Sequence, residues 1–402
     1  MIIRVRSGSK NELTVADQKI SRIKLEEGME KVVVGMSGGV DSSVAAYLLQ
    51  QQGYEVIGIT MQIWQDEDVC SMEENGGCCG LSAVEDARRV ASSLGIPYYV
   101  MNFKQEFKEN VIDYFVGEYL MARTPNPCIA CNRYVKWEAL LKRSLDIGAS
   151  YIATGHYASI ERLPNGRYSI KKSVTQAKDQ TYALYNLTQH QLAHTLMPVG
   201  AFEKDKIREI AKNLNLPVAN KPDSQEICFV PDNDYAGYIA EYLEKKKQQS
   251  DISEADSIRH YTGLQPGNYV NTAGEVIGRH KGLIHYTVGQ RKGLGIAMGQ
   301  PIFVVELRPE TNEVVLGNAN EVFSDRLVAN RLNFMSIENL DGDMVVDAKI
   351  RYSHKGARAT IKRTGPDEIL CIFDEPQRAI TPGQAVVFYD GDYVVGGGTI
   401  LK

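Results

Sequence analysis

Segments of two different periodicities alternate between residues 31 and 155. Short apolar segments rich in β-branched residues predict strands at 31–35, 55–61, 97–101 and 151–155. The segments between them have helical periodicity and predict helices at 43–52, 81–94 and 135–145. Strands that alternate with helices of about ten to fifteen residues are typical of a parallel sheet covered on both faces. We therefore expect an α/β domain with a doubly wound parallel sheet, whose ligands bind beyond the carboxyl ends of the strands.

The pattern changes in the second half of the chain. At roughly 150 residues per domain, 402 residues predict two or three domains. A lysine-rich helix at 240–249 ends the alternation, and from Tyr269 onward short strands are separated by turn dipeptides, which favours a barrel-like all-β half. The expected division is an N-terminal extension without a clear period, a catalytic α/β domain, a small central domain and a C-terminal β-barrel: 1–28, 29–232, 233–320 and 321–402.

Composition excludes several classes of protein. With 45 Lys and Arg residues against 50 Asp and Glu, the formal charge is -5, so a nucleic-acid site must be a local basic patch rather than a global field. Two stretches without an acidic residue, 276–305 and 349–363, are candidates for such a patch. No apolar run approaches the roughly 18 residues of a membrane span, and the N-terminus lacks the apolar core of a signal peptide. We therefore expect a cytoplasmic protein without a membrane partner.

Seven cysteines in such a chain do not predict a structural disulfide framework. Cys70, Cys78 and Cys79 lie in a segment rich in glycine and acidic residues, where either local metal binding or incidental surface thiols fit the pattern. Cys371 lies in a strand-like segment and is expected in a core. The remaining three cysteines are the candidates for chemistry.

Residues 37–43, with the sequence SGGVDSS, stand between a predicted strand and a predicted helix. Adjacent Gly38 and Gly39 allow a tight turn that points consecutive N–H groups at one spot, where the helix dipole adds positive charge. The result is a cradle for pyrophosphate, in which serine hydroxyls donate and Asp41 is a candidate magnesium ligand. A structural turn with a helix cap is the alternative. The Lys-Ser/Thr ending of a Walker A loop is absent, which disfavours a P-loop enzyme that transfers a γ-phosphate.

A proline-constrained loop at 124–131 presents a Cys-x-x-Cys pair, Cys128 and Cys131. A third thiol, Cys228, follows later in the chain but still before the β half. If the fold joins Cys228 to Cys131, a persulfide on one and a resolving thiolate on the other form a sulfur-transfer centre. Burial as small apolar side chains is the alternative for each thiol.

Longer motifs place these features in a family context. The loop at 37–43 resembles the pyrophosphate-binding loop of the ATP pyrophosphatase (PP-loop) superfamily, whose members split ATP between the α- and β-phosphates to adenylate a carbonyl oxygen. From Met29 to its end, the chain resembles the bacterial tRNA-specific 2-thiouridylases. The motifs that carry this resemblance are GMSGGVDSSVAA (35–46), TPNPCIACNRYVKW (124–137), ATGHYA (153–158), KDQTYAL (178–184), DSQEICF (223–229), GRHKGLIHYTVGQRKGLGI (278–296) and KIRYSHKG (349–356).

The resemblance implies a reaction and its participants. The implied reaction is ATP-dependent 2-thiolation of the wobble uridine of tRNA, through adenylation of the uracil C2 oxygen with ATP and Mg2+ and sulfur transfer through a cysteine persulfide. Cys131 matches the family's nucleophile, and Cys228 matches the cysteine that carries the persulfide. The implied partners are the anticodon arm of tRNA and a donor of sulfur, either a sulfur-relay protein or a cysteine desulfurase.

The resemblance also implies two sets of binding residues. ATP is expected against Gly35, Met36, Ser37, Gly38, Gly39, Val40, Asp41, Ser42, Met61 and Gly155. The tRNA is expected against Asn126, Pro127, Cys128, Lys178, Asp179, Gln180, Arg351 and Tyr352. His156 follows Gly155 at the same rim, and no role is assigned to it.

Cys128 departs from the commonest family pattern, which has Asp at this position. An Asp could act as a general acid or base near the uracil, which a thiol does less well. The thiols of Cys128, Cys131 and Cys228 could instead ligate three irons of an iron–sulfur cluster and leave one iron open for an exchangeable sulfide. Two other classes of protein are alternatives. The first is an adenylating ligase or amidotransferase that uses ammonia, but such an enzyme needs no thiol pair. The second is an RNA-binding scaffold with a structural metal, but such a scaffold needs no PP-loop.

Overall fold

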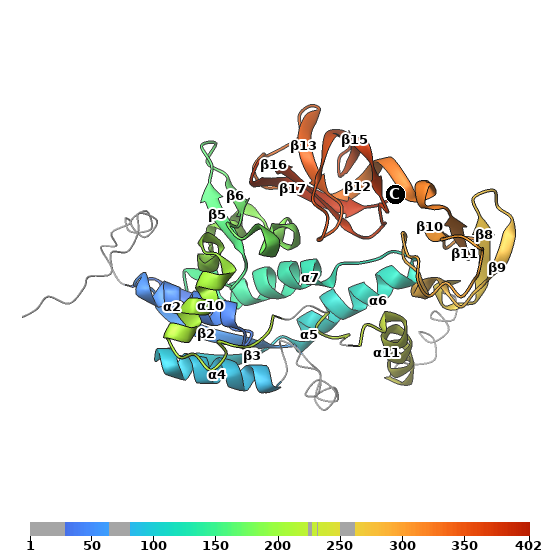
Figure 1. Cartoon of the computed structure of the whole chain (residues 1–402). Coiled ribbons are helices and arrows are strands. Elements are labelled where there is room, and N and C mark those ends of the chain that lie inside the picture. Colours follow the sequence, from blue (N-terminus) through green and yellow to red (C-terminus); the bar gives the residue numbers. More distant parts are fainter. Residues whose placement is uncertain (1–28, 64–80, 224–226, 231, 250–261) are drawn as a thin grey trace, which may run out of the picture.

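The computed structural model describes residues 29–63, 81–223, 227–230, 232–249 and 262–402. The predicted extension at 1–28 and the segment with Cys70, Cys78 and Cys79 lie outside the described residues. The described residues form a helix-covered parallel sheet, a small four-stranded sheet and a closed β-barrel (Figure 1). The barrel lies above the helices of the first body, and the small sheet lies at one end of the molecule.

The first sheet has five parallel strands in the order β3-β2-β1-β4-β7. Their bounds are β1 Lys31–Gly35, β2 Glu55–Gln62, β3 Tyr98–Asn102, β4 Tyr151–Ala153 and β7 Thr195–Leu196. Val33 of β1 enters one hydrophobic core, whereas Val32 and Val34 enter another. Successive side chains of a strand point to opposite faces, so both faces of this sheet are buried. The expected doubly wound parallel sheet is confirmed.

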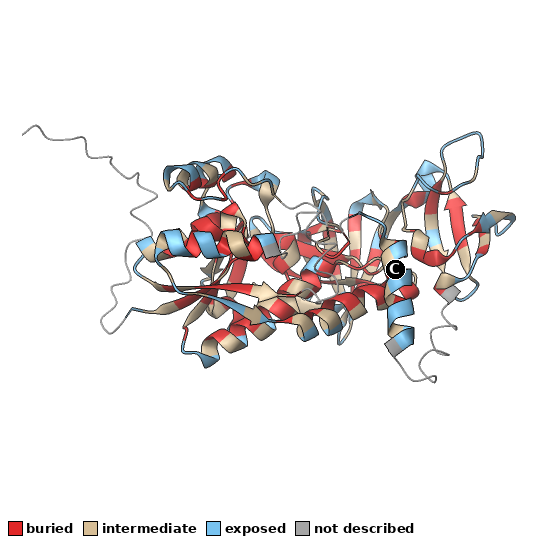
Figure 2. Ribbon diagram, turned by 90° about the horizontal axis from the view of Figure 1, so that it is seen from below, coloured by how far each residue is buried: buried red, intermediate tan, exposed pale blue. Residues whose placement is uncertain are grey.

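Two groups of helices cover the two faces (Figure 2). One group is α2 Val40–Gln51, α4 Leu81–Leu94 and α10 Lys204–Asn213. The other is α5 Lys104–Phe107, η2 Lys108–Ile112, α6 Asp113–Leu120, α7 Pro127–Ala130, η3 Cys131–Leu140 and α8 Leu141–Asp146. The helix predicted at 135–145 is thus the second part of a longer helical segment that begins at the cysteine loop. No helix within the described ranges is long and apolar enough to cross a membrane.

The four-stranded sheet has the order β10-β11-β8-β9 and follows α11 Tyr235–Gln249. Its strands are β8 Gly267–Asn271, β9 Val276–His280, β10 Phe303–Arg308 and β11 Glu313–Gly317. Short helical turns connect the larger elements: η4 Gln176–Lys178, η5 Thr181–Leu184, α9 Gln189–Ala193, η6 Pro198–Ala201, η7 Thr262–Leu264, η8 Leu283–His285 and η9 Ala319–Val322.

Six strands close into the C-terminal barrel, which confirms the expected all-β half. They are β12 Phe323–Phe334, β13 Met344–Lys349, β14 Ala357–Gly365, β15 Glu368–Arg378, β16 Ala385–Asp390 and β17 Tyr393–Ile400. The order is β12-β15-β14-β13-β16-β17, and β12 pairs with β17 to complete the ring. Ile369, Cys371 and Phe373 alternate along β15 into the barrel core, as the period of a strand requires.

A hairpin of the first body extends the sheet of the barrel. Its strands, β5 Ala158–Arg162 and β6 Tyr168–Lys172, pair with each other, and β6 pairs with β17. Hydrogen bonds add to this contact: Gln384 donates to the backbone oxygens of Thr124 and Pro125, at 2.9 and 3.2 Å. The barrel therefore packs directly against the start of the loop that carries Cys128 and Cys131.

Candidate active site

The glycine-rich loop after β1 has the tight geometry that its sequence predicts. Gly38 has a φ of 65°, and a Cβ there would lie 2.3 Å from the carbonyl oxygen of Ala83. Glycine is the residue that suits both constraints. The hydroxyl of Ser43 is fully buried and donates to the carbonyl oxygen of Gly39 at 2.7 Å. Ser43 therefore braces the first turn of α2 instead of facing a ligand.

Strands β1, β2 and β4 are parallel neighbours that end at one edge of the sheet. Gly35 ends β1, Met61 lies near the end of β2, and Gly155 follows β4. Gly155 lies against the start of α2, because a Cβ there would be 2.5 Å from the backbone nitrogen of Ser42 and 2.6 Å from the carbonyl carbon of Asp41. The structure thus gathers the ten expected ATP-binding residues at this edge, and their contact with ATP stays a prediction.

Two side chains that the motif analysis did not single out hold the carboxylate of Asp41. The Lys204 Nζ lies 2.8 and 2.9 Å from its two oxygens, and the Tyr157 hydroxyl donates to Oδ1 at 2.7 Å. Burial, followed by the charge of Asp41, raises the pKa of Tyr157, so its phenol stays protonated and remains a donor. Tyr157 belongs to the motif at 153–158 and could have been suspected. Lys204 belongs to none of the motifs and lies 163 residues from Asp41 in the chain.

Lys204 also pairs with Asp223, with Nζ 2.8 Å from Oδ1. Lys178 and Arg208 contact the same carboxylate at 2.9 and 3.0 Å. Burial alone would raise the pKa of Asp223, but the hydrogen bonds and charges of the two lysines outweigh it and lower that pKa to about 2. One ion-pair network therefore connects Asp41 in the PP-loop with Asp223, the first residue of the motif at 223–229.

We expect Asp223 to make folding stability depend on pH in the acidic range. Its pKa of about 2 in the folded protein lies below the roughly 3.9 of an unfolded chain, so the ionised carboxylate stabilises the fold above about pH 4. This contribution, about 1 kcal/mol after solvent screening of the partly exposed carboxylate, is lost as the pH falls through about 2. Urea unfolding should separate the wild type from Asp223→Asn at neutral pH and bring the two together near pH 2. A difference that does not change with pH would contradict the assignment.

The His156 imidazole lies at the same rim and is held neutral. Its Nδ1 is 2.7 Å from the hydroxyl oxygen of Thr154, and its ring centre is 5.5 Å from that of Trp137. Burial, and then the charge of Lys136, lowers the pKa of His156 well below its usual value. A neutral ring can form hydrogen bonds at this edge without adding charge to it.

The Cys-x-x-Cys pair lies where two helical segments meet. Asn126 caps α7 by accepting a hydrogen bond from the N–H of Ile129 at 3.3 Å, and Pro127 occupies the first position of the helix. Cys128 is exposed in this first turn, whereas Cys131 is half-buried at the start of η3. The cap and the proline therefore determine how the two thiols are presented.

Cys228 lies in a short described segment that aromatic packing anchors. The next residue, Phe229, is buried, and its ring meets those of Phe107 and Phe115 edge-on at 5.7 and 5.2 Å. Cys228 and Cys131 both lie half-buried against this same hydrophobic core. The structure places both thiols at the border of one core, and a direct pairing of their sulfurs stays a prediction.

The two metal-containing cofactors considered for this chain, an iron–sulfur cluster and magnesium, need different ligands. Among the described residues, which include Cys128, Cys131 and Cys228, no three His, Cys, Asp or Glu side chains are placed so that they could hold a metal ion. This result concerns a single ion, whereas the thiolates of an iron–sulfur cluster bind separate irons, so a cluster on the three thiols stays a prediction. Magnesium needs only one or two carboxylates together with phosphate oxygens and waters. Asp41, at the start of α2, supplies such a carboxylate, whose two oxygens are paired with Lys204 in the described structure.

Hydrogen bonds and an ion pair connect residues 178–180 to the sheet edge where β1, β2 and β4 end, which we call the ATP edge. Lys178 belongs to the ion-pair network, and the carboxylate of Asp179 accepts a hydrogen bond from the Thr181 hydroxyl at 2.6 Å. The side-chain oxygen of Gln180 accepts one from the N–H of Tyr157 at 2.8 Å. These bonds give the triplet a bracing role in the described structure, and its contact with tRNA stays a prediction.

Tyr352 belongs to the barrel and lies near Cys128. Its side chain is 46% exposed, and its ring meets that of Tyr182 edge-on at 6.2 Å. Burial, and then the nearby charges of Asp179 and Cys128, raises the pKa of Tyr352. Three of the expected tRNA-binding residues therefore lie near one another. The adjacent Arg351 donates to a backbone oxygen at the end of β15, at 3.0 Å.

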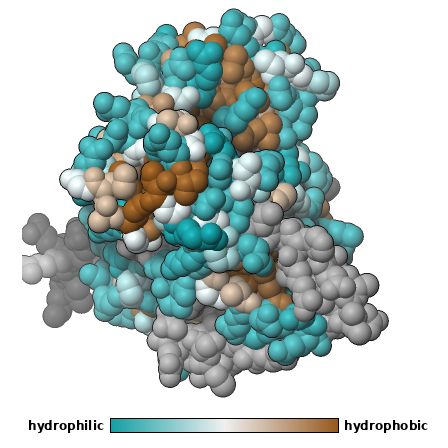
Figure 3. Space-filling view, turned by 90° about the vertical axis from the view of Figure 1, so that its right-hand side faces the viewer, coloured by the Kyte–Doolittle hydropathy of each residue, from teal (hydrophilic) through white to brown (hydrophobic). Residues whose placement is uncertain are grey.

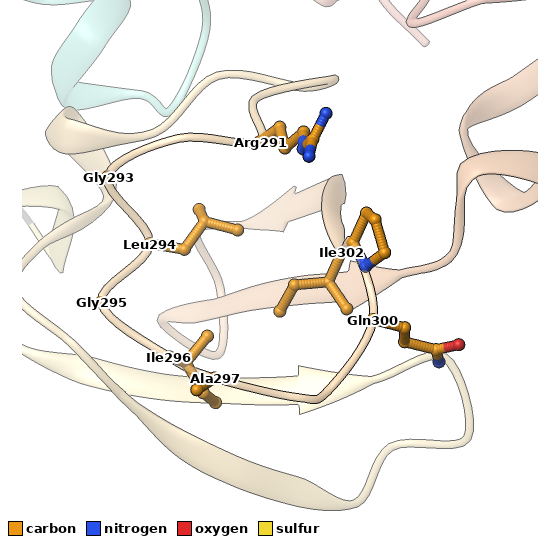
Figure 4. Close-up of a pocket in the computed structure, with 9 residues that line it drawn as sticks. Arg291, Gly293, Leu294, Gly295, Ile296, Ala297, Gln300 and Ile302 are labelled. Atoms are coloured by element: carbon orange, nitrogen blue, oxygen red, sulfur yellow. The ribbon is translucent and has the colours of Figure 1, made fainter.

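A pocket lies in the small sheet's body, at the end of the molecule away from α2 (Figure 1). Its volume is about 410 Å3, and its lining is mixed, with apolar side chains from Leu294, Ile296 and Ile302 and a charged one from Arg291 (Figure 4). From this side of the molecule, apolar side chains form separate patches among hydrophilic ones (Figure 3). The lining lacks the acidic and thiol groups that the chemistry at the ATP edge requires.

Three family patterns match successive parts of the chain. Residues 30–232 match the tRNA methyl transferase HUP domain, residues 255–318 the tRNA methyl transferase PRC-barrel domain and residues 324–400 the aminomethyltransferase β-barrel domain. These three matches agree with the parallel sheet, the small sheet and the six-stranded barrel of the fold.

Similar proteins extend over nearly the whole chain. A tRNA-specific 2-thiouridylase MnmA from Lachnoclostridium phytofermentans is 67% identical over 93% of this chain and 100% of its own length. Proteins of the same name from Clostridioides difficile and Acetivibrio thermocellus are 57% and 59% identical, over 93% and 92% of this chain and 98% and 99% of their own lengths. A solved 4-thiouridine synthetase–RNA complex with bound ATP is 19% identical over 54% of this chain and 50% of its own, with a TM-score of 0.30, too low to inform the site. The resemblance carried by the motifs is confirmed, and the chain belongs to the tRNA-specific 2-thiouridylase family.

Proposed function

We propose that the protein uses ATP to replace the C2 oxygen of the wobble uridine of a tRNA by sulfur, with Cys228 as the carrier of the sulfur and Cys131 as the resolving thiol. The family to which the chain belongs carries out 2-thiouridylation of tRNA. The proposal adds the wobble position, the chemical steps and the residues that perform them.

The proposed reaction has three steps. The C2 oxygen of uracil attacks the α-phosphorus of ATP, and pyrophosphate leaves. The terminal sulfur of a persulfide on Cys228 attacks C2, and AMP leaves with the former C2 oxygen. The thiolate of Cys131 then attacks the sulfur of Cys228, which breaks the sulfur–sulfur bond, releases 2-thiouridine and leaves a disulfide between the two cysteines. A dithiol reductant and a new sulfur from the donor protein restore the starting state.

One observation supports placing both half-reactions in a single site. Lys204 bridges Asp41 of the PP-loop and Asp223, and Cys228 follows Asp223 by five residues. The adenylating loop and the sulfur-carrying segment therefore share an ion pair. An ammonia-using ligase would need the loop without the thiols, and an RNA-binding scaffold would need neither the loop nor this connection.

The residues of the ATP edge have distinct tasks in this proposal. The N–H groups of the loop and of the first turn of α2 bind pyrophosphate oxygens, and Gly155 allows the backbone to approach closely. Asp41 would hold magnesium, which would neutralise phosphate charge. Tyr157 orients the Asp41 carboxylate through its hydrogen bond.

The proposed tRNA surface lies between α7, which carries Cys128, and the barrel. Tyr352 is exposed enough to stack on an unpaired base, and Cys128 and Asp179 lie near it. The stretch at 349–363, which contains no acidic residue, supplies positive charge for the phosphates of the anticodon arm. Asn126, Pro127, Lys178, Gln180 and Arg351 complete the proposed contact set.

A single assay tests the function. The protein is incubated with ATP, magnesium, unmodified tRNA, a dithiol reductant, and a cysteine desulfurase with cysteine as the source of persulfide sulfur. The tRNA is digested to nucleosides, and 2-thiouridine and pyrophosphate are both measured. Both products are expected, and both should require tRNA. Pyrophosphate with an amidated product would favour the ammonia-using ligase, and tRNA binding without pyrophosphate would favour the scaffold.

We expect Asp41→Asn to reduce tRNA-dependent pyrophosphate release by at least about 100-fold, because the amide replaces a charged metal ligand at the reacting phosphates. Binding of tRNA, measured by filter retention, should change less than about twofold, since the loop lies outside the proposed RNA surface. Asp325→Asn is a matched control, because Asp325 is an exposed carboxylate paired with Arg326 in the barrel. Equal losses of adenylation and tRNA binding would show that the loop is only structural.

A further inference from the structure

Thr124 begins the loop that leads to α7, and two other parts of the molecule hold it. From the barrel, the carbonyl oxygen of Pro382 accepts a hydrogen bond from the Thr124 N–H at 2.9 Å, and the Gln384 side chain donates to the Thr124 carbonyl oxygen at 2.9 Å. From the body of the small sheet, the Thr287 hydroxyl oxygen lies 3.2 Å from that of Thr124. Contacts from other bodies therefore engage the N–H, the carbonyl and the side chain of this one residue.

Gly383 lies between these two barrel contacts, in the connection from β15 to β16. Its φ is 90°, and a Cβ there would lie 2.9 Å from the backbone nitrogen of Thr124 and 3.0 Å from its carbonyl oxygen. Glycine suits both the positive φ and the close approach. A side chain at this position would have to displace the backbone of Thr124.

Such a displacement meets resistance on the N-terminal side of Thr124. The Arg123 guanidinium donates two hydrogen bonds to the carboxylate of Glu118, both at 2.6 Å, and Glu118 is 3% exposed. The Arg123 N–H also donates to the carbonyl oxygen of Glu118 at 2.9 Å. Separating a buried ion pair is costly, so Arg123 stays attached to α6. The displacement is therefore directed toward the residues that follow Thr124.

The residues that follow are stiff up to the first turn of α7. The two prolines within 125–127 have fixed φ angles, and the Asn126 side chain caps the helix by accepting from the N–H of Ile129 at 3.3 Å. Beyond this turn the helix is held in place, because Ile129 is buried and the Asn132 side chain donates to the carbonyl oxygen of Ala183 at 2.9 Å. The first turn of α7, residues 126–128, is therefore the part that a shift of Thr124 moves.

We propose that Gly383 is a positioning residue that sets the place of the first turn of α7. The inference rests on the proposed function, in which residues 126–128 contact the target uridine. Arg351 and Tyr352 of the proposed tRNA surface belong to the same barrel, which lies above α7 (Figure 1). The barrel thus binds the anticodon arm and also positions the turn that contacts its uridine.

Gly383→Ala tests this inference with two measurements. Cys128 is exposed in the first turn of α7, so its alkylation by iodoacetamide without ATP or tRNA, followed by peptide mass spectrometry, reports on that turn. The rate should change by at least about threefold, because the reactivity of a thiol depends on its local surroundings. Formation of 2-thiouridine at saturating ATP and tRNA should fall by at least about 100-fold, the effect of a misplacement of about 1 Å.

Binding should be largely retained in the same variant. Phosphate contacts supply most of the affinity for a nucleic acid, so tRNA retention on filters should change less than about threefold. Binding of ATP, measured by equilibrium dialysis, should not change, since the PP-loop is not altered. A loss of turnover with both ligands still bound distinguishes positioning from a general loss of structure, and urea unfolding verifies that the variant is folded.

Gly391→Ala is the matched control. Gly391 lies in the turn between β16 and β17 and has a φ of 58°, and a Cβ there would meet nothing within 4 Å. The substitution therefore adds the same methyl group at another positive φ of the barrel without a close contact. It should keep the wild-type rates of Cys128 alkylation and of turnover.

Thr287→Val is a second variant of the same contact. It removes the hydroxyl that lies 3.2 Å from that of Thr124 and adds no bulk. Turnover should fall by about fivefold, the usual effect of one lost hydrogen bond, with tRNA binding unchanged. This variant keeps the test decisive if Gly383→Ala does not fold, because wild-type turnover by Thr287→Val would then overturn the inference.

The outcomes separate this inference from the proposed function. Wild-type turnover by folded Gly383→Ala, a loss of turnover without a change at Cys128, or an equal loss in Gly391→Ala would each overturn the positioning role while the function stands. If the Cys128 rate changes in Gly383→Ala but the wild type forms no 2-thiouridine, the barrel positions the turn and the proposed function is wrong.

Discussion

Replacing Cys228 by alanine should abolish the formation of 2-thiouridine, by at least about 1,000-fold, because it removes the atom that carries the sulfur. Pyrophosphate release in the presence of tRNA should continue, since adenylation depends on the PP-loop and not on this thiol. The two products are measured in the same reaction, by nucleoside analysis and by a pyrophosphate assay. A parallel loss of both would mean that Cys228 maintains the structure of the site instead of transferring sulfur.

Two further cysteine variants make that result specific. Cys371 lies in the barrel core and is fully buried, and burial raises the pKa of its thiol to about 12, so it is inert. Cys371→Ala should leave turnover of the folded enzyme unchanged and cost about 1 kcal/mol of stability.

Cys128→Ala should keep much of the activity in a persulfide mechanism, and the anaerobically purified enzyme should be active without iron. Iron-dependent turnover that disappears in Cys128→Ala would establish the cluster mechanism instead.

Replacing Gly155 by alanine should reduce tRNA-dependent pyrophosphate release by at least about 100-fold, since reacting groups displaced by about 1 Å lose that much rate. The added Cβ would lie 2.5 Å from the backbone nitrogen of Ser42 and 2.6 Å from the carbonyl carbon of Asp41. Backbone atoms cannot rotate away as a flexible side chain can, so the start of α2 must shift. Overpacking of this kind costs about 1–3 kcal/mol, which urea unfolding should detect.

Gly117 provides the matched control for that substitution. It lies in α6, and a Cβ there would meet nothing within 4 Å. Gly117→Ala should leave pyrophosphate release unchanged and stabilise the protein by about 0.5–1 kcal/mol, because alanine favours a helix. Wild-type pyrophosphate release by Gly155→Ala would show that the close approach at the ATP edge is not required.

Much of the fold follows from local patterns in the sequence. The strand predicted at 31–35 and the helix predicted at 81–94 have the bounds found in the structure, because apolar periodicity is a property of neighbouring residues. The doubly wound sheet, the barrel and the family are also confirmed. They could be predicted because each prediction rests on motifs or periods within short segments. The domain bounds and the roles of the site residues stay predictions.

Local patterns therefore establish the set of elements, the PP-loop and the thiols. Which of them meet depends on the fold: β6 adds to β17 of the barrel, Gly155 approaches Asp41, and Lys204 joins Asp41 to Asp223. These contacts join residues far apart in the chain, and local periodicity carries no information about them. Lys204 shows the difference most clearly, because a lysine at the start of a polar helix is normally exposed, and only the fold places it between two carboxylates.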